Sequence, residues 1–231
     1  MHPDFIIGDD RFPLVTRRVS IGTLQIPLAL VPYTQANLDR VAAIRGFGER
    51  FWPYWLEEWV VTYALAEVLD RSSDVALQGP VLDLGCGSGF FALFLRLRFG
   101  IEAFSCDFNF DACRLAAYNA NSTISSPSPT RCESAKVFCC DFSAFPSHVQ
   151  FGSVFAGEML YSKANHSTIL TFLKRHLAPC GKAYLADLGR MAASGFDLVA
   201  QAEGFQVEVE RSHSHLQNRQ IQIFKLSLQS K

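Results

Sequence analysis

The apolar and polar positions in the first 72 residues predict a β-hairpin followed by two helices. Two β-rich apolar runs fill residues 14–31, and the short sequence IGT between them is typical of a hairpin turn. A short helix is expected over residues 35–44, and a longer one from Pro53 onward. Most aromatic side chains of the longer helix are expected in the core. Its apolar residues return at helical spacing: Trp55, Trp59, Val60, Tyr63, Ala66 and Leu69.

Beyond residue 80, short apolar runs alternate with helical segments. The runs PVLDLGCG, IEAFSCD, AKVFCCD, SVFAGEMLY and KAYLADL predict five strands. Strands that alternate with helices in this way are typical of a parallel sheet that is covered on both faces. Further on, FQVEVERS and RQIQIFKLSL alternate apolar and polar residues around a polar turn, which predicts an antiparallel hairpin.

These patterns predict an α/β fold. We expect a Rossmann-like, seven-stranded mixed sheet with helices on both faces and an antiparallel C-terminal hairpin, preceded by a small N-terminal hairpin and helix. The extension is expected in residues 1–50 and the main domain in residues 51–231. The Ser- and Pro-rich residues 122–135 are expected to form a surface loop. Cys139 and Cys140 are expected to pack inside a buried strand.

Composition narrows the classes of function. The 231 residues are 49% apolar and 19% charged with a formal charge of −1, which fits one globular domain and shows no broad basic face for nucleic acid. The seven cysteines are odd in number and lack a CxxC pair, which argues against a disulfide framework or a zinc site. No signal, transit or membrane-spanning segment is recognised, so we expect a cytoplasmic protein, most simply a monomer.

The sequence VLDLGCGSG, residues 81–89, carries the strongest chemical signal. An apolar strand leads into three glycines and then a helix, so backbone amides can approach a bound ligand at a helix N-terminus. Asp83 lies inside the strand, where it can face a ligand ammonium group, which NAD lacks. Phe90 stands where dinucleotide-binding turns keep a small residue. The turn therefore favours a nucleoside ligand that carries an ammonium group.

Two more acids stand at the ends of the next predicted strands. Asp107 ends IEAFSCD, where a carboxylate can accept hydrogen bonds from both ribose hydroxyls. Asp141 and Phe142 end AKVFCCDF, where a side chain and a ring can read the edge and the face of an adenine. One such acid is an ordinary turn former, but three at consecutive strand ends indicate a nucleoside site.

The motifs DLGCGSG, Asp107 and Asp141–Phe142 resemble those of the class I, seven-stranded S-adenosylmethionine-dependent methyltransferases, over about residues 79–228. The resemblance implies S-adenosyl-L-methionine as cofactor and S-adenosyl-L-homocysteine as product. It also implies the cofactor-binding residues. The methionine end would contact Asp83, Gly85, Cys86, Gly87 and Gly89, the ribose Asp107, and the adenine Asp141 and Phe142. Phe108 is also expected to bind the cofactor.

The stretch GEMLYS, residues 157–162, bears on the methyl acceptor. An alkyl ammonium group, with a pKa of about 10.4, must lose a proton before it can attack a methyl group. Glu158 can bind and orient that group, and Tyr161 can line its channel. Methyltransferases that act on nucleobases or glutamine typically have Asn/Asp-Pro-Pro-Tyr/Phe here, and this chain lacks those prolines. We therefore expect Glu158 and Tyr161 to act as catalytic residues, with Glu158 also beside the cofactor.

Three segments point to a branch of the superfamily. EMLY resembles the acid-x-x-Tyr/Phe motif of the protein-lysine methyltransferase group called methyltransferase family 16. FWPYW and LADLGR are similar to segments of its electron-transfer flavoprotein β-subunit lysine methyltransferase branch. The resemblance implies that Trp55 covers the cofactor and that the partner is a protein substrate. A small-molecule N-methyltransferase of the nicotinamide type and a catalytically silent S-adenosylmethionine-binding module stay open as alternatives.

Overall fold

The structure is a computed structural model. It describes the ranges 4–46, 52–72, 79–122, 136–145, 148–214 and 218–228, together with positions 48 and 77. All but the first residue of the predicted loop at 122–135 lies outside the described residues.

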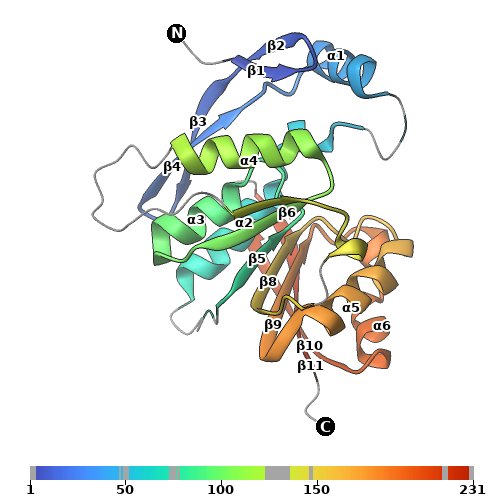
Figure 1. Cartoon of the computed structure of the whole chain (residues 1–231). Helices are drawn as coiled ribbons and strands as arrows, with labels where there is room; N and C mark the ends of the chain where they lie inside the picture. Colours follow the sequence, from blue (N-terminus) through green and yellow to red (C-terminus); the bar gives the residue numbers. More distant parts are fainter. Residues whose placement is uncertain are drawn as a thin grey trace.

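One seven-stranded sheet organises the main domain, as predicted (Figure 1). Its strand order is β10-β11-β9-β8-β5-β6-β7. Strands β5 to β9 are parallel, and β11 runs antiparallel to both β9 and β10. The strands are β5 (Val81–Leu84), β6 (Ala103–Asp107), β7 (Lys136–Cys139), β8 (Phe151–Gly157), β9 (Leu177–Asp187), β10 (Phe205–Ser214) and β11 (Arg219–Leu228).

Helices cover both faces of this sheet (Figure 1). One face carries α2 (Val60–Arg71), α3 (Phe90–Phe99) and α4 (Phe110–Ser122), and the other carries α5 (Ala164–His176) and α6 (Phe196–Ala202). Side chains alternate along a strand, so Val81 of β5 joins the core with α2 and α3, whereas Leu82 and Leu84 join the core with α5 and α6. Asp83 therefore faces the side of α3. No helix in the described ranges is long and apolar enough to cross a membrane.

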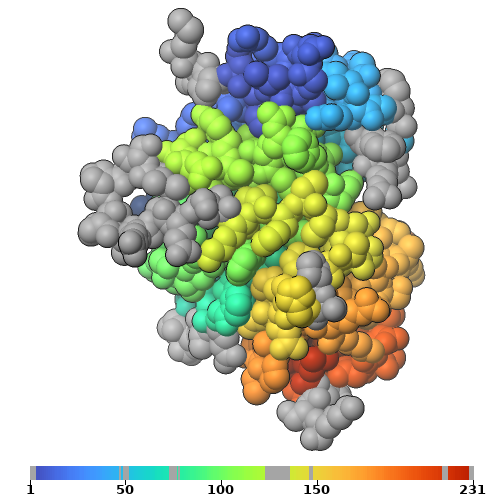
Figure 2. All heavy atoms as spheres, in the orientation of Figure 1, coloured from blue at the N-terminus to red at the C-terminus, as the bar shows by residue number. Residues whose placement is uncertain are grey.

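The N-terminal extension contains two hairpins and a helix. The predicted hairpin is β3 (Val15–Ile21) and β4 (Leu24–Leu30), and the predicted helix is α1 (Gln35–Arg45). A second hairpin, β1 (Asp4–Ile7) and β2 (Asp10–Pro13), was not predicted. The N-terminal residues lie directly on α4 (Figure 2), and buried residues of β3 and β4 share one core with α2 and α3.

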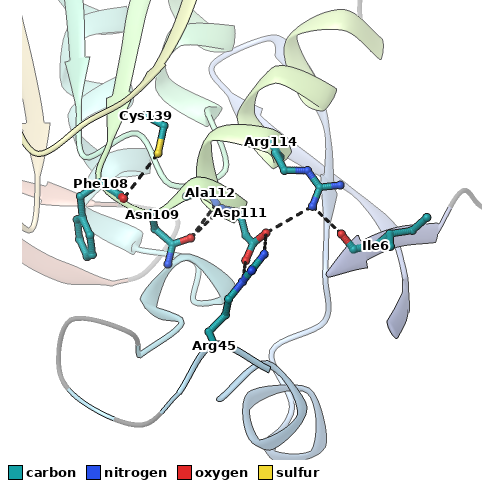
Figure 3. Close-up of polar contacts among 8 residues, drawn as sticks. All are labelled: Ile6, Arg45, Phe108, Asn109, Asp111, Ala112, Arg114 and Cys139. Atoms are coloured by element: carbon teal, nitrogen blue, oxygen red, sulfur yellow. Dashed lines mark hydrogen bonds and ion pairs between the residues drawn. The ribbon is translucent and has the colours of Figure 1, made fainter. Parts of the chain in front are cut away.

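A buried carboxylate fastens the extension to the main domain (Figure 3). The Asp111 side chain is 2% exposed and accepts two hydrogen bonds from Arg45, at 2.7 and 2.8 Å. Arg114, one turn further along α4, also contacts Asp111 and donates to the carbonyl oxygen of Ile6 at 2.6 Å. These contacts join α1 and β1 to the N-terminal turn of α4.

The early helix begins later than the sequence predicts. Pro53 precedes a 3₁₀ turn, η1 (Tyr54–Leu56), and α2 starts only at Val60. The aromatic residues before Val60 are placed by tertiary contacts and not by a helix. Trp55 packs on Phe5 with ring centroids 5.8 Å apart, in a core cluster with the extension. Such tertiary contacts outweigh the helical spacing of the aromatic residues.

The placement of Cys139 and Cys140 in a buried strand was wrong. Strand β7 lies at the edge of the sheet, so Cys139 is exposed and Cys140 is only partly buried. An edge strand can be as apolar in sequence as an inner strand, so the hydrophobic pattern does not show which position a strand takes in the sheet.

Candidate active site

The glycine turn joins β5 to α3 at the carboxyl edge of the sheet. The backbone N–H groups of Gly85 and Cys86 both donate to the carbonyl oxygen of Cys106, at 2.8 and 3.0 Å, which holds the turn against β6. Gly89 has a φ of +77°, and a Cβ atom there would lie 2.8 Å from the backbone of Ala116 in α4. A Cβ atom at Gly87 would meet nothing within 4 Å, so the backbone is open there to a ligand.

Asp83 is a buried acid beneath this turn. Its side chain faces the first turn of α3, where Oδ2 accepts a hydrogen bond from the backbone N–H of Ala92 at 3.3 Å. Asp83 is 4% exposed, and burial, aided by the charge of Asp107, raises its pKa to about 7. The hydrogen bond from Ala92 opposes this rise but does not cancel it. A cationic ligand group beside Asp83 would stabilise its charged form.

Asp107 is held by two backbone amides at the end of β6. Its Oδ2 accepts from Gly87 at 3.0 Å and its Oδ1 accepts from Asn109 at 2.8 Å. Asn109 in turn accepts hydrogen bonds from the first backbone amides of α4, at Asp111 and Ala112 (Figure 3). Burial raises the pKa of Asp107. The carboxylate is thus fixed in place, and the ring of the neighbouring Phe108 is 44% exposed beside it.

Asp141 and Phe142 lie at the start of the turn η3 (Phe142–Ala144). Asp141 caps this turn by accepting hydrogen bonds from the backbone N–H and the hydroxyl group of Ser143. The Phe142 ring packs edge-on against Phe172 of α5, with ring centroids 6.0 Å apart. A hollow of about 230 Å³ lies between η3 and α5. Of the predicted site residues only Phe142 lines it, so we do not identify this hollow with the cofactor site.

Glu158 follows β8 and lies against the glycine turn. Its φ of +59° is a left-handed conformation that costs a non-glycine residue about 1 kcal/mol or more. The next residue, Met159, places its sulfur 2.7 Å from where a Cβ atom of Gly85 would be. Because Glu158 and Met159 are adjacent, the strained turn brings the acid beside the cofactor-binding loop predicted from sequence.

The Glu158 carboxylate has one paired and one unpaired oxygen. Neither buried carboxylate oxygen accepts a hydrogen bond of regular geometry among the described residues, but Oε2 forms an ion pair with Nη2 of Arg190 at 2.5 Å, which leaves Oε1 without a partner of either kind. Glu158 is 5% exposed, and burial raises its pKa to about 7, opposed by Arg190 and aided by the charges of Asp187 and Glu57. A buried carboxylate oxygen without a partner points to a ligand that donates hydrogen bonds.

The surroundings of two other predicted residues differ from each other. Tyr161 is 48% exposed at the surface. Trp55 is 5% exposed inside the cluster of the extension, and its indole N–H has no partner among the described residues. The structure thus brings together Asp83, the glycine turn, Asp107 and Glu158, while the roles of Tyr161 and Trp55 stay predictions.

Sequence reasoning missed several residues at this edge. The backbone amide of Asn109 orients Asp107, and Arg190 pairs with Glu158. Asp187 at the end of β9 is fully buried, and its Oδ1 accepts a hydrogen bond from the backbone N–H of Arg190 at 2.8 Å. The sequence LADLGR contains both Asp187 and Arg190, so it indicated this contact between them. No group of three or more His, Cys, Asp or Glu residues in the described ranges is arranged to hold a metal ion.

The residues present fit S-adenosylmethionine. The open backbone at Gly87, the buried acid Asp83 and the amide-held acid Asp107 lie around one turn, and a nucleoside with an ammonium group matches that set. The cofactor would supply an electrophilic methyl group on a sulfonium.

Comparisons with known proteins agree with this fit. Residues 81–181 match a family model described as a methyltransferase domain. The ribosomal protein L11 methylase from Lactobacillus delbrueckii subsp. bulgaricus has a TM-score of 0.57 at 16% identity, covering 75% of this chain and 81% of that one. No curated protein sequence matches the chain.

Two N-methyltransferases with bound S-adenosylhomocysteine also share the fold. The glycopeptide N-methyltransferase MtfA has a TM-score of 0.58 at 16% identity, covering 86% of this chain and 100% of its own. NodS from Bradyrhizobium japonicum WM9 has a TM-score of 0.56 at 15% identity, covering 84% and 98%. The chain therefore has the fold of class I S-adenosylmethionine-dependent methyltransferases. Residues 81–181 match the methyltransferase domain model, and the cofactor of this fold is S-adenosylmethionine.

Proposed function

We propose that the chain is an S-adenosylmethionine-dependent N-methyltransferase whose acceptor is a lysine side chain of a protein. One observation carries the proposal: Glu158 presents a buried, unpartnered carboxylate oxygen beside the glycine turn. A lysine ammonium group has three N–H donors and a positive charge, so it can supply what this oxygen lacks. A planar amide has no charge to match it.

The raised pKa of Glu158 suits the proton balance of the reaction. Methyl transfer to an ammonium group releases one proton, which must leave before nitrogen can attack. Moving this proton from a lysine with a pKa of about 10.4 to a carboxylate with an ordinary pKa of about 4.5 spans a pKa difference of about 6 units, or about 8 kcal/mol. With the Glu158 pKa at about 7, the gap is about 3.4 units, or about 4.6 kcal/mol. Burial thus makes Glu158 a better proton acceptor.

The comparisons support an N-linked acceptor more broadly than a lysine. Two of the structural neighbours are named as N-methyltransferases, and a third as a methylase of a ribosomal protein. The sequence motif EMLY narrows the proposal to the protein-lysine group, where the resemblance implies that Tyr161 lines the acceptor channel and Trp55 covers the cofactor.

Methyl transfer from tritiated S-adenosylmethionine into a heterologous cell lysate tests the proposal. We expect label in one or a few protein bands, and amino-acid analysis should recover it as methylated lysine. Glu158→Gln should keep S-adenosylmethionine binding in calorimetry and lower transfer by about 100-fold or more, the range of a lost general base. Glu102→Gln, at the opposite edge of the sheet, is the matched control and should transfer normally. Label that appears only in the small-molecule fraction would contradict the lysine assignment.

A further inference from the structure

Arg190 is held on three sides near the predicted acceptor site. Its backbone N–H donates to Oδ1 of the fully buried Asp187 at 2.8 Å. Its guanidinium pairs with Oε2 of Glu158 at 2.5 Å and lies over the ring of Trp59, 5.4 Å from the ring centroid. Trp59 is itself anchored, because its indole N–H donates to the carbonyl oxygen of Tyr54 at 3.0 Å.

This ion pair differs from an ordinary surface pair. The side chain of Arg190 is 31% exposed, but that of Glu158 is only 5% exposed, so the carboxylate depends on this contact for most of its compensation. An aromatic platform further limits the orientations of a planar guanidinium group. The pair therefore fixes Glu158 and leaves a single carboxylate oxygen, Oε1, for a ligand.

We infer that Arg190 is a positioning residue of the acceptor site, which holds Glu158 Oε2 from the face of Trp59 so that Oε1 is presented to the acceptor amine. The inference rests on the proposed function. Arginine suits this role because its guanidinium does not give up a proton in proteins. It therefore cannot exchange places with Glu158 as proton acceptor during the reaction, as a lysine can.

Arg190 also sets the charge balance around Glu158. Three charged groups act on Glu158: Arg190 lowers its pKa, whereas Asp187 at the end of β9 and Glu57 after η1 raise it. Without Arg190 only the two acids remain, so the Glu158 pKa must rise above about 7. An opposite charge at this range shifts a carboxyl pKa by about 1–3 units, and the partial exposure of Arg190 favours the lower end.

A direct test follows the carboxyl group of Glu158 by carbon-13 NMR in the full-length protein, with Glu158→Gln to assign its resonance. We expect a titration midpoint near 7 in the wild type and a rise of about one unit or more in Arg190→Met. Arg98→Met is a matched control, because Arg98 pairs with Asp70 at 2.5 Å and lies 5.5 Å from the Phe99 ring at the end of α3. This control should leave the midpoint unchanged.

The pH profile of transfer to lysate protein gives the second readout. With a midpoint near 8 in place of 7, the charged fraction of Glu158 at pH 7 falls from about half to about a tenth. Transfer by Arg190→Met should therefore drop about fivefold at pH 7 and recover most of that loss at pH 9. Arg190→Lys keeps the charge but not the planar contact with Trp59. We expect a midpoint close to that of the wild type, with lower transfer at every pH.

Two results would overturn the inference: an unchanged Glu158 midpoint in Arg190→Met, or normal transfer by that variant at pH 7. Affinity for S-adenosylmethionine, measured by calorimetry, should stay at the wild-type value in both Arg190 variants, and a loss would mean that Arg190 serves the cofactor instead. Should the wild type transfer no methyl to lysine, the proposed function fails. The NMR midpoint would still decide whether Arg190 holds Glu158.

Discussion

Asp83→Asn should make the cofactor-free protein more stable and remove its response to S-adenosylmethionine. Asp83 is 4% exposed and has one hydrogen bond of 3.3 Å, from the backbone of Ala92, so its charge is poorly compensated until a cation binds. Asparagine has nearly the same shape and can accept the same hydrogen bond, but it has no charge to bury. The variant therefore separates the cost of the charge from the packing of the side chain.

The shift in pKa sets the size of the effect. A rise from 3.8 to about 7 is about 3.2 units, or about 4.4 kcal/mol for the fully charged group. At pH 7 about half of the groups keep their proton, which reduces the cost to about 4 kcal/mol. Burying the amide also has a cost, so 4 kcal/mol is a ceiling, and we expect a net gain of about 1–2 kcal/mol. That corresponds to a melting temperature higher by about 2–8 °C for a chain of this size.

The dependence on pH distinguishes this cause from others. The pKa of Asp83 is higher in the folded than in the unfolded state, so the folded protein loses stability as the pH rises from about 4 to about 7. The advantage of the variant should be small at pH 4 and complete above pH 7. Calorimetric melting at pH 4, 6 and 8 measures it, with Asp39→Asn in the exposed part of α1 as the control. A variant less stable than the wild type at pH 8, or a stability difference that does not change with pH, would refute this reasoning.

The same melts with cofactor complete the test. A ligand at 100 times its dissociation constant stabilises a folded protein by about 2.7 kcal/mol. The wild type should gain about that much from S-adenosylmethionine, and Asp83→Asn should gain nothing at the same concentration. A variant that still gains stability would show that Asp83 does not contact the cofactor.

Two further predictions concern other parts of the molecule. Arg45→Met should lower the free energy of unfolding in urea by about 1–3 kcal/mol, because Asp111 stays buried but loses this ion pair. The expected loss is below the usual cost of a broken buried pair because Arg45 is 36% exposed. Arg11→Met, which removes an exposed ion pair with Asp4, should change the free energy of unfolding by less than about 1 kcal/mol, and equal losses in both would contradict this role of Asp111. Binding of S-adenosylmethionine at pH 7 should release about half a proton from Asp83, seen by calorimetry in buffers of different ionisation enthalpy, and almost none at pH 9. Release that persists undiminished at pH 9 would assign the proton to another group.

The sheet was predictable because its strands and helices alternate in sequence as they do in space. Each parallel strand needs a crossover, so apolar runs separated by helical segments restrict the fold to few arrangements. The start of α2 and the exposure of β7 were not predictable, since both depend on distant partners. Trp55 leaves the helical pattern to pack on Phe5, and Cys139 is exposed because no strand follows β7 in the sheet order.

The candidate site was predictable in part for a similar reason. The carboxyl ends of parallel strands meet at one edge, so acids that end consecutive strands come together whatever the loops do. Asp83 and Asp107 needed only this rule, and the contact of Gly87 with Asp107 at 3.0 Å agrees with it. The ion pair of Arg190 with Glu158 needed more. It depends on a left-handed turn after β8 and on the platform of Trp59, which lies far away in the chain.

The buried acids at this edge favour cationic ligands. Asp83, Asp107 and Glu158 are each harder to ionise than in water because of burial, and Asp107 adds to the shift of Asp83. Without a cation nearby, Asp83 and Asp107 are expected to stay poorly compensated or to bind a proton, whereas Glu158 keeps its ion pair with Arg190. Under the proposed function, a sulfonium cofactor with an ammonium group and an amine acceptor would supply positive charge at both ends of this edge. The acceptor amine would give up its proton before it is methylated, and a carboxyl group with a pKa of about 7, such as Glu158, can hold that proton until product leaves.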